Sequence, residues 1–219
     1  PNLMDICINS WREKLPDYEI IEWNESNLDF ENEINNNAFL KECLDRKLWA
    51  FLSDYFRMKV LYENGGIYLD TDMQIIKSLD EFLEDDFFIG LESEDVISAG
   101  IIGAIPHHEV VKDILDFYKE DIWNEPIYTI PAIITRVLKK KYSFELKDEI
   151  IKIKDGSIKM YPSNYFYPYH FTEEFQYSKI TEKTHGIHWW GKSWGKKKDL
   201  KKLYFLEFKH FKGMKKILV

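Results

Sequence analysis

Hydrophobic positions recur at helical spacing in the middle of the chain and stop at a pair of glycines. This spacing predicts a helix over roughly residues 41–63. Gly65 and Gly66 follow at once, and glycine readily adopts the positive φ angle at which many helices end. Residues 67–69 are apolar but too few for another helix. We therefore expect a short core strand directly after the turn.

Strand-like and helix-like patterns alternate along the rest of the chain, which predicts an α/β domain. The strand-like stretches are residues 18–23, 74–76, 87–92, 99–104 and 149–161, the last with a turn at Asp155-Gly156. The helix-like stretches are residues 4–11, 106–118 and 130–141. With 219 residues, 45% of them hydrophobic, the chain can bury one sizeable core. We expect one α/β domain over residues 1–195.

Charge separates the end of this chain from its body. The net charge is −8, yet residues 191–219 carry ten lysines against Asp199 and Glu207, so residues 1–190 carry −16. An acidic body is not expected to bind nucleic acid. Residues 196–219 form a basic amphipathic tail, which could dock on the domain, bind a partner or lie on an anionic membrane surface.

The two cysteines and the lack of long apolar runs indicate the compartment. Cys7 and Cys43 lie in helix-like apolar patterns and match no metal motif, which favours buried free thiols in a reducing cytoplasm. No stretch approaches the roughly 18 consecutive apolar residues of a membrane span, and no signal peptide is evident. We expect a soluble cytoplasmic protein, with the tail able to associate with the inner face of the membrane.

Two carboxylates follow the predicted strand at residues 67–69. In strand geometry Asp70 and Asp72 point to the same side and repel each other unless a cation or a hydrogen-bond donor lies between them. Hard oxygen ligands suit Mg²⁺ or Mn²⁺, which keep positions open for phosphate oxygens. A solvated turn is the alternative for so short a motif. Asp54 and Arg57 lie three residues apart on one helix face, where they can pair or project together into a site.

The motif S-D-Y-F-R at residues 53–57 and the run L-Y-E-N-G-G-I-Y-L-D-T-D-M at residues 61–73 resemble a known family. Across residues 46–76 the chain is similar to the family 32 glycosyltransferases, the DXD sugar-binding region group. That group includes bacterial capsular and exopolysaccharide transferases and yeast mannosyltransferases, and is related to the clostridial glucosylating toxins. The resemblance implies a GT-A fold, a central mixed sheet flanked by helices.

The resemblance also implies a reaction. A hexose would pass with retention from a nucleotide-diphosphate sugar, most simply a UDP-sugar, to a glycan or lipid-linked saccharide during polysaccharide synthesis, with Mn²⁺ or Mg²⁺ as cofactor. It assigns Asp54 to hydroxyls of the donor sugar and Arg57 to the sugar or its phosphate. Asp70 would bind ribose or sugar, and Asp72 would hold the metal.

Further positions match the resemblance more loosely. Trp23 and Asn24 would lie beside the nucleotide together with Tyr68. Trp23 could equally well be a structural residue in the core or at a sheet edge. Residues 188–194 match the pattern H-x-W-x-x-S-W, which would fold over the diphosphate. There His188 would complete the metal shell or be an ordinary core histidine. The remaining candidate contacts to phosphate, metal or sugar are Lys192, Ser193 and Trp194.

Some positions depart from the family pattern and keep other functions open. Relatives carry an asparagine where this chain has Ser98 or Ala99, and a glycine where it has Ile130, and they begin with a strand that this sequence does not contain. A non-catalytic module that binds a sugar nucleotide or a glycan is therefore the main alternative. A metal-dependent phosphohydrolase is disfavoured, because a second metal would need more clustered ligands than His185 and His188.

Overall fold

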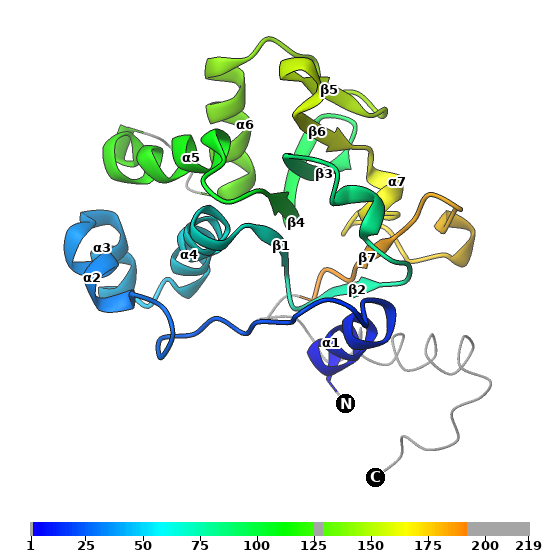
Figure 1. Cartoon of the computed structure of the whole chain (residues 1–219), viewed down its shortest axis with the longest axis horizontal. Coiled ribbons are helices and arrows are strands. Elements are labelled where there is room, and N and C mark those ends of the chain that lie inside the picture. Colours follow the sequence, from blue (N-terminus) through cyan, green and yellow to red (C-terminus); the bar gives the residue numbers. More distant parts are fainter. Residues whose placement is uncertain (1, 125–128, 192–219) are drawn as a thin grey trace.

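A five-stranded mixed sheet lies at the centre of the protein (Figure 1). The computed structural model describes residues 2–124 and 129–191. In spatial order the strands are β1 (Gly66–Leu69), β4 (Val96–Ala104), β3 (Phe87–Ser93), β6 (Ile158–Tyr161) and β5 (Ile151–Ile153). Only the β3–β6 pair is parallel. As a result β1, β3 and β6 run in one direction, and their carboxyl ends meet at the same edge.

A second, two-stranded sheet connects the middle of the chain to its later part. Strand β2 (Met73–Ile75) pairs antiparallel with β7 (Gly186–His188), and Met73 is opposite His188. Helix α1 (Leu3–Lys14) packs on this sheet, where the indole of Trp11 donates a hydrogen bond to the carbonyl of Met73 at 2.6 Å. The pairing therefore places His188 next to the end of the D-x-D segment.

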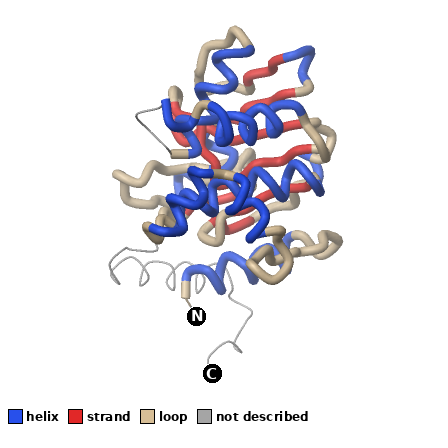
Figure 2. The backbone as a smooth tube through the Cα atoms, turned by 90° about the vertical axis from the view of Figure 1, so that its left-hand side faces the viewer, coloured by secondary structure: helices blue, strands red, loops and turns tan. Residues whose placement is uncertain are grey.

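Helices cover both faces of the central sheet. Five of them pack on one face and form the main core with alternate residues of β3 and β4, and Figure 2 shows them in front of the strands. These are α2 (Phe30–Asn36), α3 (Ala38–Asp45), α4 (Trp49–Asn64), α5 (Glu109–Glu120) and α6 (Ile130–Lys141). The other face packs against α7 (Ser163–Phe166), α1 and β2. Within the described residues, no helix combines the length and apolarity needed to cross a bilayer.

A large irregularity interrupts the pairing of β3 with β4. Ile89 is opposite Ile102, but Leu91 is opposite Ile97, so Gly90 alone faces residues 98–101. Such a bulge frees backbone groups from the ladder and redirects nearby side chains. Gly90 also lets the ring of Tyr167 approach, because a Cβ atom there would lie 2.5 Å from Tyr167 Cε2. The bulge lies beside Asp70 and supplies two carbonyl groups to the site.

Three predictions about local structure are wrong. The helix expected over residues 41–63 is two helices, because Lys47 adopts φ 58° and the amide of Leu48 turns back to the carbonyl of Cys43. β1 is an edge strand that is only half-buried, since it pairs with β4 alone among the described strands. Residues 18–23 form no strand, and Ile20, Ile21 and Trp23 are exposed, because no strand of the described residues pairs with this segment.

Other predictions are confirmed. Residues 149–161 contain the expected hairpin, with β5 and β6 antiparallel around a 3₁₀ turn at Lys154–Gly156. Gly65 ends α4 with φ 68°. Cys7 and Cys43 are buried and unbridged. The basic tail at residues 196–219 lies outside the described residues.

Candidate functional site

The D-x-D segment leaves the carboxyl end of β1 and turns into β2. The amide of Asp70 donates to the carbonyl of Gly100 in the bulge at 2.8 Å, and the amide of Met73 donates to the carbonyl of Asp70 at 2.9 Å. This turn directs both carboxylates toward His188. The imidazole Nε2 lies 3.1 Å from Asp72 Oδ1 and 4.0 Å from Asp70 Oδ2. Together the three residues offer ligand atoms that all lie within 4.8 Å of one another.

Residues after β7 hold the Asp72 side of this cluster. The amide of Gly191 donates to Asp72 Oδ2 at 2.8 Å, and the amide of Trp189 donates to the carbonyl of Asp72 at 3.1 Å. The ring of Trp190 lies 4.2 Å from that of His188, measured between centroids. Both Asp72 oxygens therefore have fixed partners, which orients the carboxylate.

Arg57 organises the other side of the cluster. Its guanidinium lies 2.8 Å from Asp54 Oδ1 and 3.1 Å from Asp70 Oδ1, and it donates to the carbonyl of Ala99 at 2.9 Å. The ring of Tyr68 lies under it, 4.6 Å from the guanidinium carbon, and the Tyr68 hydroxyl donates to Asp70 Oδ1 at 2.7 Å. Asp70 thus uses one oxygen for Arg57 and Tyr68 and turns the other toward His188.

Burial dominates the electrostatics around Arg57. Burial raises the pKa of Asp54 to about 6, despite the opposing charge of Arg57, and the negative charge of Asp70 adds to the rise. Burial also opposes the charge of Arg57, but Asp70, Tyr68 and Asp54 raise its pKa overall. Arg57 is shared between two carboxylates, which is why it compensates Asp54 only in part. Arg57 Nε and Tyr118 Oη are buried without a hydrogen-bond partner among the described residues.

The donor set fits a hard divalent cation. Two carboxylates and one imidazole converge, and among the described residues no lysine or arginine lies within ion-pair distance of Asp72. Oxygen ligands with one imidazole suit Mn²⁺ well and are compatible with Mg²⁺. Asp70 joins Asp72 and His188 in this set, as the spacing of the two aspartates suggested, whereas the family resemblance had assigned it to ribose or sugar.

The structure brings together six of the predicted site residues and leaves others apart. Those that meet are Asp54, Arg57, Tyr68, Asp70, Asp72 and His188. Trp23 is exposed, and Asn24 accepts hydrogen bonds within its own turn from Ser26. No contact among the described residues joins these two to the cluster. Lys192, Ser193 and Trp194 lie outside the described residues.

Tyr167 was not among the predicted site residues, yet it lies under the cluster. Its hydroxyl accepts a hydrogen bond from the amide of Ile101 at 3.1 Å, and its ring packs edge-on against His188 with centroids 5.6 Å apart. Tyr167 therefore supports both the bulge and the histidine. Gly90, placed in the middle of an apolar strand, is the one local signal that could have predicted a close approach there.

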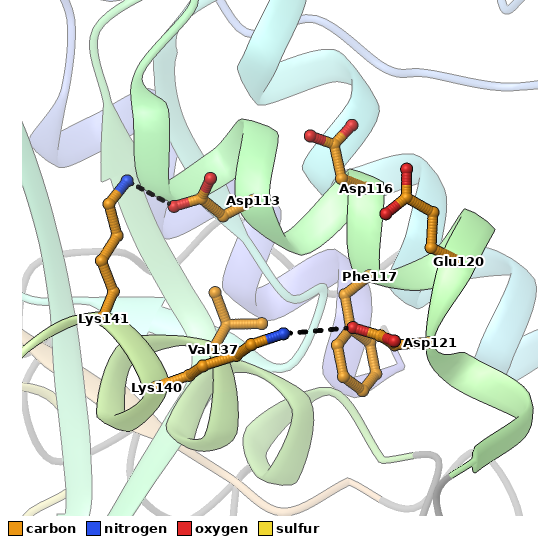
Figure 3. A pocket seen from close by; sticks show the side chains of 8 residues that line it. All are labelled: Asp113, Asp116, Phe117, Glu120, Asp121, Val137, Lys140 and Lys141. Atoms are coloured by element: carbon orange, nitrogen blue, oxygen red, sulfur yellow. Dashed lines mark hydrogen bonds and ion pairs between the residues drawn. The ribbon is translucent and has the colours of Figure 1, made fainter.

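A separate groove lies between α5 and α6, away from this cluster (Figure 3). Its volume of about 320 Å³ is within the range of small-molecule pockets. Both of its lysines, however, are already paired with carboxylates: Lys140 lies 3.4 Å from Asp121 Oδ2 and Lys141 lies 2.7 Å from Asp113 Oδ2. None of the predicted site residues lines this groove, so the chemistry is placed at the D-x-D cluster.

Comparison with known proteins gives consistent results across the chain. Residues 1–89 match the glycosyltransferase sugar-binding region containing a DXD motif, and residues 107–205 match the alpha 1,4-glycosyltransferase conserved region. The human alpha-1,4-N-acetylglucosaminyltransferase is 27% identical over 153 residues, which cover 68% of this chain and 41% of the relative. The human lactosylceramide 4-alpha-galactosyltransferase is 27% identical over 158 residues, covering 66% and 42%.

A more distant relative and a solved structure agree with these matches. A mannosyl phosphorylinositol ceramide synthase of Saccharomyces cerevisiae is 28% identical over 163 residues, covering 69% of this chain and 43% of the relative. The chain thus spans about two fifths of the length of these relatives. The structure of the PaToxG glycosyltransferase superposes with a TM-score of 0.50 at 15% identity, covering 64% of this chain and 62% of that one, which confirms the predicted GT-A fold. The chain is thus similar to glycosyltransferases in both halves, and its first 89 residues match the sugar-binding region that contains a DXD motif.

Proposed function

We propose that this protein transfers a hexose from a nucleotide-diphosphate sugar, a UDP-sugar in the first instance, to a glycan or lipid-linked acceptor. The observation that carries the proposal is the cluster of Asp70, Asp72 and His188 beside the Asp54–Arg57 pair. The first group can hold a divalent cation for a diphosphate, and the second presents a buried carboxylate for a neutral sugar. A nucleotide sugar requires both features side by side.

Each residue has a task that follows from its contacts. Asp70, Asp72 and His188 would hold Mn²⁺ or Mg²⁺, which when bound neutralises charge on the departing nucleoside diphosphate. Asp54 accepts hydrogen bonds from donor-sugar hydroxyls. Arg57 has its terminal nitrogens engaged by Asp54, Asp70 and the carbonyl of Ala99, so it orients both carboxylates and adds positive charge near the phosphates.

Transfer with retention is part of the proposal. The bond between the anomeric carbon and the phosphate oxygen breaks, and the bond to the acceptor oxygen forms on the same face of the sugar. The acceptor proton passes to the departing phosphate. The names of the two human relatives specify alpha products, which retention gives from the alpha linkage of a UDP-hexose.

We also propose an acceptor class and a cellular location for the protein. Two relatives are named for ceramide lipids that carry a sugar or a phosphoinositol headgroup, which supports a lipid-linked acceptor. Such an acceptor would be met at a membrane surface, and a peripheral cytoplasmic location remains our expectation.

The test is turnover of a donor panel in the presence of Mn²⁺. Release of nucleoside diphosphate is measured with UDP-glucose, UDP-galactose, UDP-N-acetylglucosamine and GDP-mannose for the wild type, Asp72→Asn and the control Asp45→Asn. Asp45 is exposed at the end of α3, so its variant should match the wild type. We expect one donor to turn over and Asp72→Asn to lose the activity. Binding of a donor without turnover would instead identify a non-catalytic sugar-nucleotide module.

A further inference from the structure

The carboxyl end of β3 carries a second carboxylate beside the metal-type cluster. β1 and β3 run in the same direction with β4 between them, so Glu92 and Asp70 lie at the same edge of the sheet. Neighbouring strands are about 4.8 Å apart, which puts the ends of β1 and β3 roughly 10 Å apart. Glu92 is therefore close to the cluster without belonging to it. Open α/β sheets bind their ligands along this edge.

Glu92 is half-buried, and its surroundings leave most of its hydrogen-bonding capacity unused. Ser98, a buried residue of the bulge, lies close enough to favour the charged form of its carboxylate. Burial raises the pKa of Glu92, while the nearby His170 and His188 act in the opposite direction. In the part of the chain that the structure describes, no lysine or arginine forms an ion pair with it. A carboxylate can accept about four hydrogen bonds, so Glu92 can bind the hydroxyl groups of a ligand.

An aromatic group lies on the same side of the sheet as this carboxylate, because Tyr167 packs both against Gly90 of β3 and against Trp190. The ring of Phe171 lies 4.0 Å from His170 and 5.8 Å from Trp190, and its side chain is 51% exposed. Trp190 has φ 52° and also packs against His188. A bulky residue in the left-handed region is strained, and such strain concentrates at functional sites. Exposed aromatic rings offer an apolar face to the C–H side of a sugar, while a carboxylate binds its hydroxyls.

We propose that Glu92 and the aromatic group of His170, Phe171 and Trp190 form the acceptor subsite, and that this subsite takes a neutral sugar. The inference rests on the proposed function, since it needs a donor site on the Asp54 side. Glu92 accepts a hydrogen bond from a hydroxyl of the acceptor ring and so positions the ring for transfer. Its negative charge disfavours acceptors that carry a carboxylate of their own.

The experiment compares Glu92→Gln with the wild type and with Glu94→Gln, an exposed neighbour in the same hairpin. The amide keeps the shape of the side chain and one acceptor oxygen but loses the charge. The probes are lactose, p-nitrophenyl β-glucoside and the anionic p-nitrophenyl β-glucuronide, with the donor found active in the panel. Transfer to each probe and donor hydrolysis in its absence are measured separately.

We expect Glu92→Gln to raise the KM for the neutral probes roughly 10- to 100-fold, the range for one charged hydrogen bond. Donor hydrolysis should stay within about twofold of the wild type, and the preference for glucoside over glucuronide should shrink. Glu94→Gln should change none of these values. An unchanged acceptor KM in Glu92→Gln would overturn the inference, as would donor hydrolysis by the wild type without transfer to any neutral probe. Absence of donor turnover in the wild type would overturn the proposed function itself.

Discussion

Asp54 is a buried carboxylate, and its charged form lowers the stability of the folded protein. Its pKa rises from the usual 3.8 to about 6, because burial outweighs the attraction of Arg57. Because the pKa of Asp54 is higher in the folded protein than in the unfolded chain, its effect on stability depends on pH. The contribution of Asp54 to stability is largest below pH 3.8, where the carboxyl is protonated in both states, and it is lost as the pH rises through 6. A rise of roughly two units corresponds to about 3 kcal/mol at pH 8, since one unit is worth about 1.4 kcal/mol.

Asp54→Asn removes this cost because asparagine has the shape of the protonated acid. We expect the variant to be more stable than the wild type at pH 8, by about 3 kcal/mol at most, and to differ little from it at pH 4. Urea unfolding followed by tryptophan fluorescence at both pH values measures the difference. The exposed control Asp45→Asn should follow the wild type at each pH.

The same variant should bind the donor less tightly, because an amide is a weaker acceptor for sugar hydroxyls than a carboxylate. A gain in stability together with a loss of donor affinity would show that the charge is kept for function. A variant less stable than the wild type at pH 8 would refute the reasoning, since the ion pair with Arg57 would then outweigh burial.

Two further predictions concern the supports of the site and the fold. Tyr167→Phe leaves the buried amide of Ile101 without its acceptor and should lower the free energy of unfolding by about 1–3 kcal/mol. A urea midpoint equal to that of the wild type would contradict this. The Nδ1 atom of His108 accepts a hydrogen bond at the start of α5, and burial lowers the pKa of this histidine. The stabilisation by His108 is therefore complete above about pH 6.5 and declines as the pH falls below that value. His108→Asn keeps a capping acceptor and should weaken the loss of thermal stability between pH 7 and pH 5; an unchanged pH slope would show that other groups set it.

Local sequence patterns predicted helices and strands better than they predicted which strands pair. The apolar runs gave β3 and β4, and the turn residues Asp155-Gly156 gave the β5–β6 hairpin, because these signals depend on neighbours in sequence. Residues 18–23 alternate like a strand yet lie outside both sheets, since a strand also needs a neighbour that local sequence does not specify. The break at Lys47 was missed for a similar reason, because lysine carries no signal for a positive φ angle.

Long-range contacts explain what the sequence could not show about buried charge. Neighbouring aspartates usually lie in solvent, but Asp85 is buried, pairs with Lys159 and accepts a hydrogen bond from the hydroxyl of Tyr161. These partners lie more than seventy residues away, which no periodicity reveals. The grouping of Asp54, Arg57 and Asp70 could be predicted because all three belong to one sequence motif. Glu92 has no local pattern that distinguishes it from an acidic residue on the surface.

The central claim is that Asp70, Asp72 and His188 hold a divalent cation for a nucleoside diphosphate. Calorimetric titration of UDP and GDP into the wild type, with and without Mn²⁺, tests it without requiring turnover. We predict that one nucleotide binds in the presence of Mn²⁺, and that Asp72→Asn and removal of the metal each weaken binding at least tenfold, while Asp45→Asn changes nothing. Tight binding that is indifferent to both Mn²⁺ and the Asp72 carboxylate would contradict the claim.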